Sequence, residues 1–347
     1  MESMHYVGLD VHKKSVSYCV KKVDGSLVTE GKIPATMAAL SDWSRSLPKP
    51  WSAAMEATIF SGWIYDLLLP EASEVKVAHP LMLRAISAAK KKNDRVDADR
   101  ICDLLRCDLL PECRMAPTRT RDLRRVLRYR NLMVRQAVSI KNRMSGLLME
   151  TGISYETPKL HQKRYFENLL EELRKDRSDS LPQLLGLSRA TVTALMSMER
   201  TLIRQLLRED ELHDRVLRLM TIPAVGPVTA LTWALEIGDV SRFRSLKQVI
   251  SYAGLSADEC SSGEKRYRMP LSKKCNKHLK MVLIEAARIA PYWNPELNAI
   301  YQRECERGHR NRAALAVARK IAGYLLAVDR RETGFVVNLS TAEQPAA

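Results

Sequence analysis

The chain has 347 residues, with 56 Lys and Arg against 40 Asp and Glu, and a formal net charge of +16. This length allows two or three domains with cores of their own, and the basic excess favours a polyanionic partner. No apolar run is long enough to span a membrane and the N-terminus lacks a signal-peptide core, so we expect a cytosolic protein without a membrane span. Seven scattered cysteines without a CxxC pair disfavour zinc-ribbon proteins and disulfide-framed proteins.

Residues 1–112 predict an α/β domain. Apolar runs, alternation and the Asp24-Gly25 turn predict strands over 6–10, 16–20, 27–29, 51–56 and 75–78. Helical spacing of apolar residues predicts helices over 36–47 and 63–69 and a last helix that carries Asp94, Asp97, Ile101, Leu104 and Leu105. Three meandering strands followed by alternating helices and strands is the order of an RNase H-like sheet.

Four carboxylates in this domain are candidate ligands of a divalent metal. Asp10 ends the first strand and Glu56 ends the fourth, while Asp94 and Asp97 stand three residues apart at the start of a helix and so share a face. Mg²⁺ takes oxygen ligands, and paired metals can clamp the attacking and leaving oxygens of a phosphodiester. The alternative is that these acids are solvent-exposed charges, helix caps and members of salt bridges.

Residues 113–215 predict a mainly helical linker. Between Arg114 and Glu150 there are ten Lys or Arg and only two acids, spread around apolar residues at helical spacing. Arg124 and Arg128 lie in this stretch and are candidate nucleic-acid contacts. A second helical stretch is predicted from about residue 190 to 219, after a polar segment near 154–188. Such helices suit a coiled-coil arm, a nucleic-acid-binding arm, or an ordinary bundle with a solvated charged face.

Residues 216–335 predict a mainly α domain, followed by a disordered tail over 336–347. The run Ile222–Ala230 resembles a helix-hairpin-helix turn, in which Gly226 lets a phosphate approach the N–H groups that open the next helix. Seven Lys or Arg between Lys265 and Lys280 are interleaved with Tyr267 and His278 and indicate a backbone-tracking surface. Its candidate contacts are Lys265, Arg266, Arg268, Lys273 and Lys274.

A serine stands before glycine at the start of this basic segment, in Ser261-Ser262-Gly263. A flexible backbone with cationic neighbours can hold a phosphate. A lone serine in such a position is more often a turn or capping hydroxyl, so the residue alone does not identify a nucleophile.

Motifs along nearly the whole chain resemble those of the IS110 family of DEDD transposases. In the first domain they are Gly8-Leu9-Asp10-Val11-His12-Lys13, Met55-Glu56-Ala57 and Lys92-Asn93-Asp94-Arg95-Val96-Asp97-Ala98. In the last domain they are Ile222-Pro223-Ala224-Val225-Gly226-Pro227, Tyr252-Ala253-Gly254-Leu255, Ser262-Gly263 and Leu271-Ser272-Lys273-Lys274-Cys275-Asn276. Two residues depart from the pattern. Asn93 stands where the family usually has a small residue such as Thr, and Cys275 stands where we expect Gly.

This resemblance implies a RuvC-like N-terminal domain, a helical coiled-coil linker and a C-terminal transposase domain. It implies a site-specific DNA recombinase of an insertion sequence that works on donor and target DNA, with a structured non-coding RNA of the element as guide. The implied catalytic residues are Asp10, Glu56, Asp94 and Asp97 as ligands of Mg²⁺ or Mn²⁺, and Ser262 as nucleophile. Ser261 is the alternative nucleophile, and Asp99 is the less favoured ligand.

Further expectations follow from the chemistry of joining DNA ends. Because four ends are joined, we expect a homodimer or homotetramer. His12 is a candidate for nucleic-acid contact or proton transfer, or else a structural residue after the first strand. Two other functions remain open, namely a RuvC-like nuclease that resolves branched DNA with metal-activated water, and a non-catalytic nucleic-acid-binding protein.

Overall fold

The computed structural model describes residues 3–86, 93–176, 180–262 and 265–336. The chain folds as two compact units, Met1–Arg119 and Thr120–Ala347, which are described separately. The division of the second unit near residue 215 stays a prediction, and all of the expected tail except Val336 lies outside the described residues. None of the helices in the described ranges is both long and apolar enough to cross a membrane.

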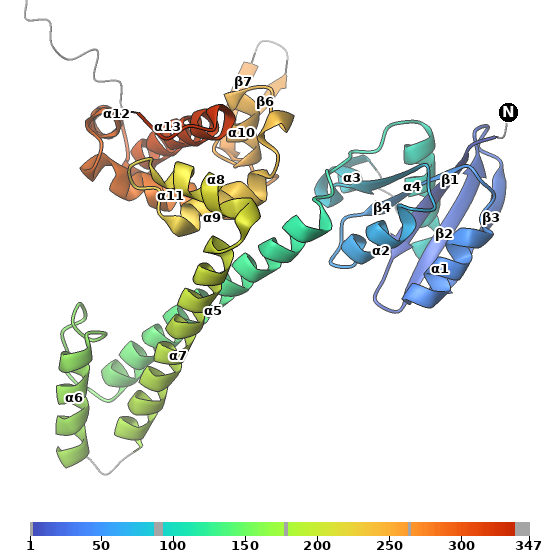
Figure 1. Cartoon of the computed structure of the whole chain (residues 1–347). Coiled ribbons are helices and arrows are strands. Elements are labelled where there is room, and N and C mark those ends of the chain that lie inside the picture. Colours follow the sequence, from blue (N-terminus) through green and yellow to red (C-terminus); the bar gives the residue numbers. More distant parts are fainter. Residues whose placement is uncertain (1–2, 87–92, 177–179, 263–264, 337–347) are drawn as a thin grey trace, which may run out of the picture. The chain divides into compact units, whose positions relative to one another are not determined.

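A five-stranded sheet forms the centre of the first unit (Figure 1). Its strands are β1 (His5–Val11), β2 (Ser15–Lys22), β3 (Leu27–Pro34), β4 (Trp51–Glu56) and β5 (Glu74–Ala78). They lie in the order β3-β2-β1-β4-β5. The first three strands are antiparallel, whereas β4 runs parallel to β1 and to β5. The mixed α/β fold expected for this part of the chain is confirmed.

Different helices cover the two faces of this sheet, because side chains alternate along each strand. The helices are α1 (Met37–Ser46), α2 (Ser61–Leu68), α3 (Pro80–Ile86) and α4 (Asp94–Arg106). Val7 and Leu9 of β1 pack in one core with residues of α1 and α2. Tyr6 and Ala54 face the opposite side and pack with Ile101 of α4. Residues of even number in β1 and β4 therefore lie on the α4 face.

Gly8 sets how closely α4 approaches β1. A Cβ atom at Gly8 would lie 2.0 Å from the backbone oxygen of Ala98 and 2.4 Å from the backbone nitrogen of Cys102. Such close packing of helix on strand is possible only where no side chain stands between them. Because residues i and i+2 of a strand share a face, the same approach brings α4 to the face of Asp10.

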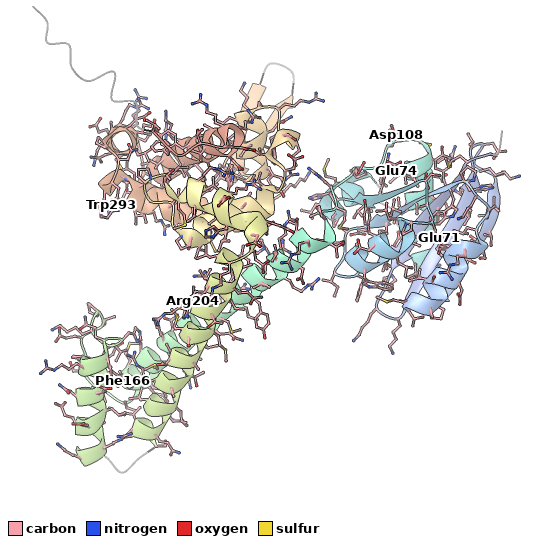
Figure 2. All side chains as sticks on the ribbon, in the orientation of Figure 1. Glu71, Glu74, Asp108, Phe166, Arg204 and Trp293 are labelled. Atoms are coloured by element: carbon pink, nitrogen blue, oxygen red, sulfur yellow. The ribbon has the colours of Figure 1, made fainter. Side chains whose placement is uncertain are left out.

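Two long helices run side by side at the start of the second unit (Figure 1). They are α5 (Thr118–Glu150) and α7 (Leu181–Leu207), and the Nε atom of Arg130 in α5 donates to Glu199 in α7 at 2.7 Å. Helix α6 (Lys163–Asp176) packs on one end of this pair, where Phe166 is buried (Figure 2). The polar segment expected near 154–188 thus contains a helix that the sequence pattern did not show.

The remaining helices of the second unit pack around a separate core. They are α8 (Asp210–Met220), α9 (Pro227–Ile237), α10 (Leu246–Tyr252), α11 (Lys277–Ile289), α12 (Pro295–Glu306) and α13 (Arg310–Arg331). Trp233, Leu283 and Ile321 lie in their common core and are fully buried. The single helix expected over about 190–219 is two helices, because the chain turns at Arg208 and Glu209 between α7 and α8. The mainly α character of the second unit is confirmed.

One β-hairpin interrupts this helical unit and was not expected from the sequence. Strands β6 (Ala257–Ser262) and β7 (Lys265–Leu271) are antiparallel, with Ser262 paired to Lys265. Polar residues dominate β6, so the alternation that marks a half-buried strand is missing. A two-residue connection that begins with glycine, such as Gly263-Glu264 in this sequence, is typical of a type II′ hairpin. This pair of residues could have indicated the hairpin from the sequence.

Candidate functional site

Asp10 and Glu56 lie at neighbouring strand ends on the face that α4 covers. Leu9 is paired with Met55 in the parallel register of β1 and β4, so Asp10 and Glu56 occupy the next positions of the two strands. Neighbouring strands are about 4.8 Å apart. The register therefore places these two carboxylate-bearing residues side by side at one edge of the sheet, as the sequence predicted.

Helix α4 begins at this edge and carries the other two acids. Asn93 is its N-cap, and the side-chain oxygen of Asn93 accepts from the backbone N–H of Arg95 at 3.2 Å. Asp94 and Asp97 lie in the first turn, where carboxylates are favoured by the helix dipole. Asn is as good a cap as Thr, so the departure at residue 93 leaves the start of the helix intact.

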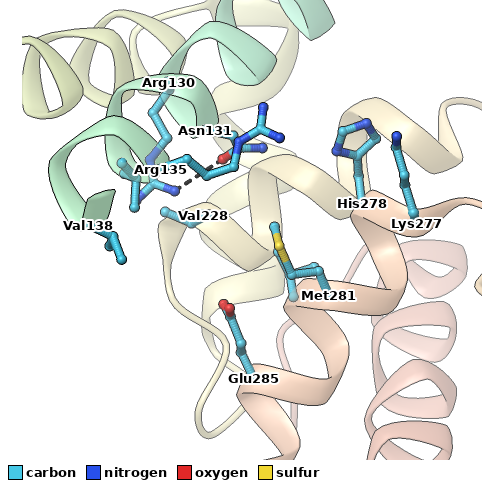
Figure 3. A pocket seen from close by; sticks show the side chains of 11 residues that line it. Arg130, Asn131, Arg135, Val138, Val228, Lys277, His278, Met281 and Glu285 are labelled. Atoms are coloured by element: carbon cyan, nitrogen blue, oxygen red, sulfur yellow. Dashed lines mark hydrogen bonds between the residues drawn. The ribbon is translucent and has the colours of Figure 1, made fainter. Parts of the chain in front are cut away.

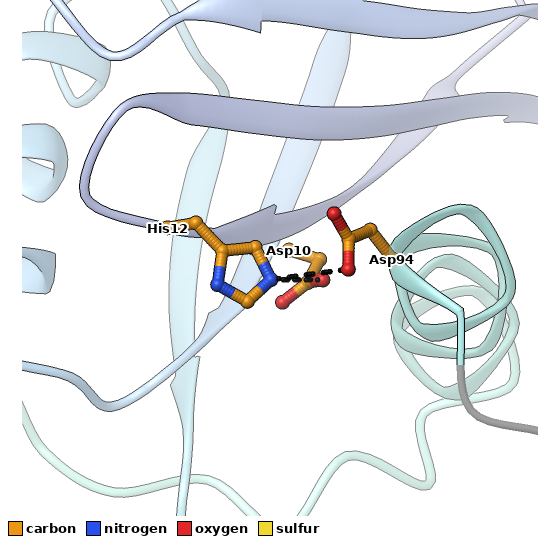
Figure 4. A group of neighbouring side chains, drawn as sticks. All are labelled: Asp10, His12 and Asp94. Atoms are coloured by element: carbon orange, nitrogen blue, oxygen red, sulfur yellow. Dashed lines mark hydrogen bonds and ion pairs between the residues drawn. The ribbon is translucent and has the colours of Figure 1, made fainter.

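His12 bridges the strand acid and the helix acid (Figure 4). Its Nε2 atom lies 3.0 Å from Oδ2 of Asp10 and 3.4 Å from Oδ1 of Asp94. Asp10, His12 and Asp94 each offer one ligand atom, and these atoms lie within 4.8 Å of one another. The structure thus joins Asp10 to Asp94 and adds His12, which the sequence had left between a functional and a structural role.

The pKa of Asp10 depends on its burial and on the charged side chains around it. Burial raises the pKa of Asp10, the hydrogen bond and charge of His12 oppose this, and the charges of Asp94 and Asp97 raise it further. Asp94 differs, because a hydrogen bond from Lys32 at 3.3 Å lowers its pKa. A half-buried carboxylate facing two further acids fits a divalent cation, because the cation would offset their mutual repulsion.

The other acids of this region have different neighbours. The charge of Asp97 raises the pKa of Asp10, and Oδ1 of Asp97 lies 3.9 Å from Nη1 of Arg100. Asp99 accepts an ion pair from Nζ of Lys21 at 2.7 Å, and Asp103 shares the same lysine. This agrees with the preference for Asp97 over Asp99 as a ligand, which stays a prediction.

Gly8→Ala is expected to separate α4 from β1 and so to disturb the acidic cluster. The added methyl group has no room, and overpacking of this kind costs about 1–3 kcal/mol. Displacement of reacting groups by about 1 Å can cost roughly 100-fold in rate, so transposition should fall by that order. Urea unfolding and a plasmid transposition assay measure the two effects. Gly146→Ala is the matched control, because a Cβ at Gly146 meets no atom within 4 Å; equal loss in both variants would contradict the prediction.

A second group of charged side chains surrounds Glu236 at the end of α9. The side chain of Glu236 is 2% exposed, accepts from Nη2 of Arg128 at 3.0 Å and accepts from Nδ2 of Asn276 at 2.8 Å. Burial alone would raise the pKa of Glu236, but Arg128, Asn276 and Arg124 outweigh it and lower the pKa. Arg124 also donates from Nε to the backbone oxygen of Leu235 at 2.7 Å. Both arginines thus have structural partners, and their contact with nucleic acid stays a prediction.

Asn276→Asp is expected to destabilise the second unit. Asn276 caps α11 by accepting from the backbone N–H of His278 and donates to the buried Glu236. Aspartate keeps the cap but places a second carboxylate against Glu236, and an uncompensated buried charge costs about 3–5 kcal/mol. Asn294→Asp is the matched control, because Asn294 caps α12 in the same way, accepting from Leu297 N–H at 3.1 Å. Urea unfolding should show a loss only for Asn276→Asp; equal losses would place the effect in the cap.

The two motifs on either side of the hairpin also contact each other. A Cβ at Gly254, whose φ is +67°, would lie 2.4 Å from Sγ of Cys275. Cys275 itself has no positive φ, so glycine is not required there, and the departure at residue 275 leaves the turn intact. Lys273 and Lys274 are exposed beside it. Ser262 ends β6, while Gly263 lies outside the described residues.

The helix-hairpin-helix-like segment lies between α8 and α9. Ala224 has a φ of +67°, a left-handed conformation that favours glycine. Gly226 is the N-cap of α9 and Pro227 its first residue, and no side chain caps this end. The N–H groups that open α9 therefore have no side-chain cap, as a phosphate contact would require.

Comparison with known proteins agrees with these features. A transposase model for the DEDD domain of IS110 elements matches residues 7–153, and the model of the transposase IS116/IS110/IS902 family matches residues 216–302. The transposase for insertion sequence element IS1328 of Yersinia enterocolitica is 25% identical, with 96% of this chain and 99% of that protein covered.

Two other relatives have nearly the same percentage identity to this chain. The probable family 20 transposase of Pseudomonas aeruginosa is 26% identical over 94% of this chain and 97% of its own length. The transposase for IS1111A of Coxiella burnetii is 26% identical over 70% of this chain and 68% of its own length. With the acids of the first match gathered at one sheet edge and the second match over the C-terminal helices, the chain belongs to the IS110 family of DEDD transposases and is a DNA transposase.

Proposed function

We propose that the protein is a site-specific recombinase of an insertion sequence that cuts and rejoins DNA through a serine–phosphodiester intermediate. The observation that carries this proposal is the meeting of Asp10 and Asp94 at one edge of the sheet, bridged by His12. A divalent cation held at this edge would offset the repulsion between the two carboxylates. The nucleophile is Ser262, with Ser261 as the alternative.

We assign an RNase H-like, RuvC-like fold to the first unit from its strand order. In that fold the carboxylates of Asp10, Glu56, Asp94 and Asp97 hold Mg²⁺ or Mn²⁺. When bound, the cation polarises the scissile phosphate and offsets the charge that develops on it. The residues fit this role, because their oxygens suit a hard cation and their repulsion falls when it binds.

The serine supplies the step that a metal site alone does not. Its Oγ attacks phosphorus and loses its proton, the P–O bond to the departing strand breaks, the departing oxygen takes up a proton and leaves as a DNA hydroxyl, and the phosphate becomes esterified to the serine. A DNA hydroxyl later attacks the same phosphorus and releases the serine, so the bond energy is conserved for rejoining. The carboxylates assist this exchange on the same phosphodiester, and either group alone is expected to be inert.

A helix N-terminus and several basic residues of the second unit would hold the nucleic acid. Gly226 opens a helix whose N–H groups can meet a phosphate, and Lys273 and Lys274 are exposed. We include Lys265, Arg266 and Arg268 as contacts on sequence grounds. We further propose that a non-coding RNA of the element guides the choice of donor and target, and that the enzyme acts as a dimer or tetramer.

The full-length protein, purified with whatever nucleic acid accompanies it, tests this function. Sequencing of the bound RNA should give one structured transcript from the element. Incubation of that complex with labelled DNA across an element end, with Mg²⁺ and an SDS quench, should give a protease-sensitive protein–DNA adduct. Cleavage without an adduct would favour a metal-dependent nuclease, which needs only the acidic cluster of the first unit. No cleavage at all would favour a binding protein.

A further inference from the structure

We infer that a groove between α5, α9 and α11 binds an unpaired nucleotide of a nucleic-acid strand. This inference rests on the proposed function in one respect, that the second unit handles nucleic acid. The groove has a volume of about 590 Å³, within the range of roughly 300–1,000 Å³ typical of small-ligand sites.

One wall of the groove is apolar. Val134 and Val138 of α5, Val228 of α9, and Met281 and Val282 of α11 line it. Met281 points toward Val228 across the groove (Figure 3), and 43% of Met281 remains exposed. An apolar, partly open wall of this kind suits the face of a base, whose burial removes apolar surface from water.

The mouth of the groove is basic. Arg135 of α5 and Lys277 at the start of α11 line it and are both exposed, and neither has an ion-pair partner among the residues that the structure describes. Arg130 also lines the groove, but it is held by Glu199 and Asn131. Two cations without internal partners beside an apolar wall match a nucleotide, which joins an apolar base to an anionic phosphate.

His278 and Glu285 give the groove polar groups besides the two cations at its mouth. Burial lowers the pKa of His278, and the nearby charges of Arg128, Lys277 and Arg135 lower it further against the opposing effect of Glu236. The lowered pKa favours the uncharged imidazole of His278, which can hydrogen-bond, while Arg135 and Lys277 are the cations of the mouth. Glu285 lies two turns along α11 from Lys277, about 12 Å away along the helix axis, and lines the same groove.

The position of Glu285 gives the groove a preference among bases. A carboxylate accepts hydrogen bonds from the exocyclic amino group of cytosine and has no such donor to meet on thymine. In the proposed binding mode the phosphate lies at Arg135 and Lys277, the base lies on the apolar wall, and the edge of the base meets Glu285, which lines the same groove. We therefore expect the groove to favour cytosine over thymine.

Binding of short oligonucleotides to the full-length protein tests the inference. The probes are fluorescent 12-residue oligo(dC), oligo(dT) and oligo(rC), and a duplex of the same length, measured by anisotropy at several salt concentrations. The double variant Arg135→Gln/Lys277→Gln should weaken single-strand binding by about 10–100-fold and lower the salt slope by about 1.4. The matched control Arg143→Gln/Lys247→Gln removes two exposed cations that do not line the groove.

Each outcome of this experiment decides a different point. Failure of the wild type to bind any probe would contradict the proposed function itself. If both double variants weaken single-strand binding equally, general charge attraction would explain the data. The same holds if Arg135→Gln/Lys277→Gln weakens duplex binding as much as single-strand binding. Either result would overturn only the groove. Glu285→Gln should remove the preference for oligo(dC) over oligo(dT) while oligo(dT) binding is kept; an unchanged preference would overturn the base contact. The stronger of oligo(dC) and oligo(rC) identifies the strand as DNA or RNA.

Discussion

Asp10→Asn is expected to lower transposition by about 10³-fold, the upper range for loss of one preorganised electrostatic contact in a reacting site. Asp10 is the most buried acid of the Asp10–His12–Asp94 group, with 15% of its side chain exposed against 44% for Asp94. Asparagine keeps the shape and can still accept a hydrogen bond from His12, so the change removes mainly the charge. A plasmid assay with paired donor and target measures the effect. Asp42→Asn, an exposed acid on α1, is the control and should leave activity unchanged.

Thermal melting separates this loss of activity from loss of fold. The charge of Asp10 faces Asp94 and Asp97, and burial adds to its cost. Without divalent cation, Asp10→Asn should therefore melt at the same temperature as the wild type or higher. Addition of Mg²⁺ should raise the melting temperature of the wild type, since a ligand that binds only the folded state stabilises it, and should change the variant little. Normal transposition by Asp10→Asn would contradict the metal-binding proposal, and a lowered melting temperature would show that activity is lost through the fold.

The parts of this site that depend on local pattern were predictable from the sequence. Short apolar runs predicted the two strands β1 and β4 with Asp10 and Glu56 at their ends, and helical spacing placed Asp94 at the start of α4. Each of these features depends on residues close together along the chain. That is why their positions could be read without knowledge of the fold.

The parts that depend on distant segments were not predictable. Gly8 reads as an ordinary strand glycine until α4 is seen to pass within van der Waals contact of it. The bond between Asn276 and Glu236 joins residues 40 positions apart, and nothing local marks either as a partner. The partners of Arg124 and Arg128 were not predictable either. In the sequence these residues belong to a basic helical face, whereas in the structure Arg128 donates to the buried carboxylate of Glu236 and Arg124 donates to the backbone oxygen of Leu235.

Ser262→Ala is expected to lower strand exchange by about 10⁶-fold, the loss that follows removal of the nucleophile in serine hydrolases. A methyl group cannot form the ester to phosphorus, so no covalent adduct should appear in an SDS quench. Gel analysis of labelled DNA measures strand cleavage and adduct together. A nuclease that uses water would instead keep near-normal cleavage in this variant, and that outcome would contradict the serine mechanism.

The neighbouring residue supplies the control that assigns the nucleophile. Ser261 and Ser262 are consecutive in β6, and the proposed mechanism needs a single nucleophile, which we assign to Ser262. Ser261→Ala should therefore keep both cleavage and adduct. Loss of the adduct in Ser261→Ala with retention in Ser262→Ala would move the nucleophile to Ser261. Equal melting temperatures for both variants would place the whole difference in the chemical step.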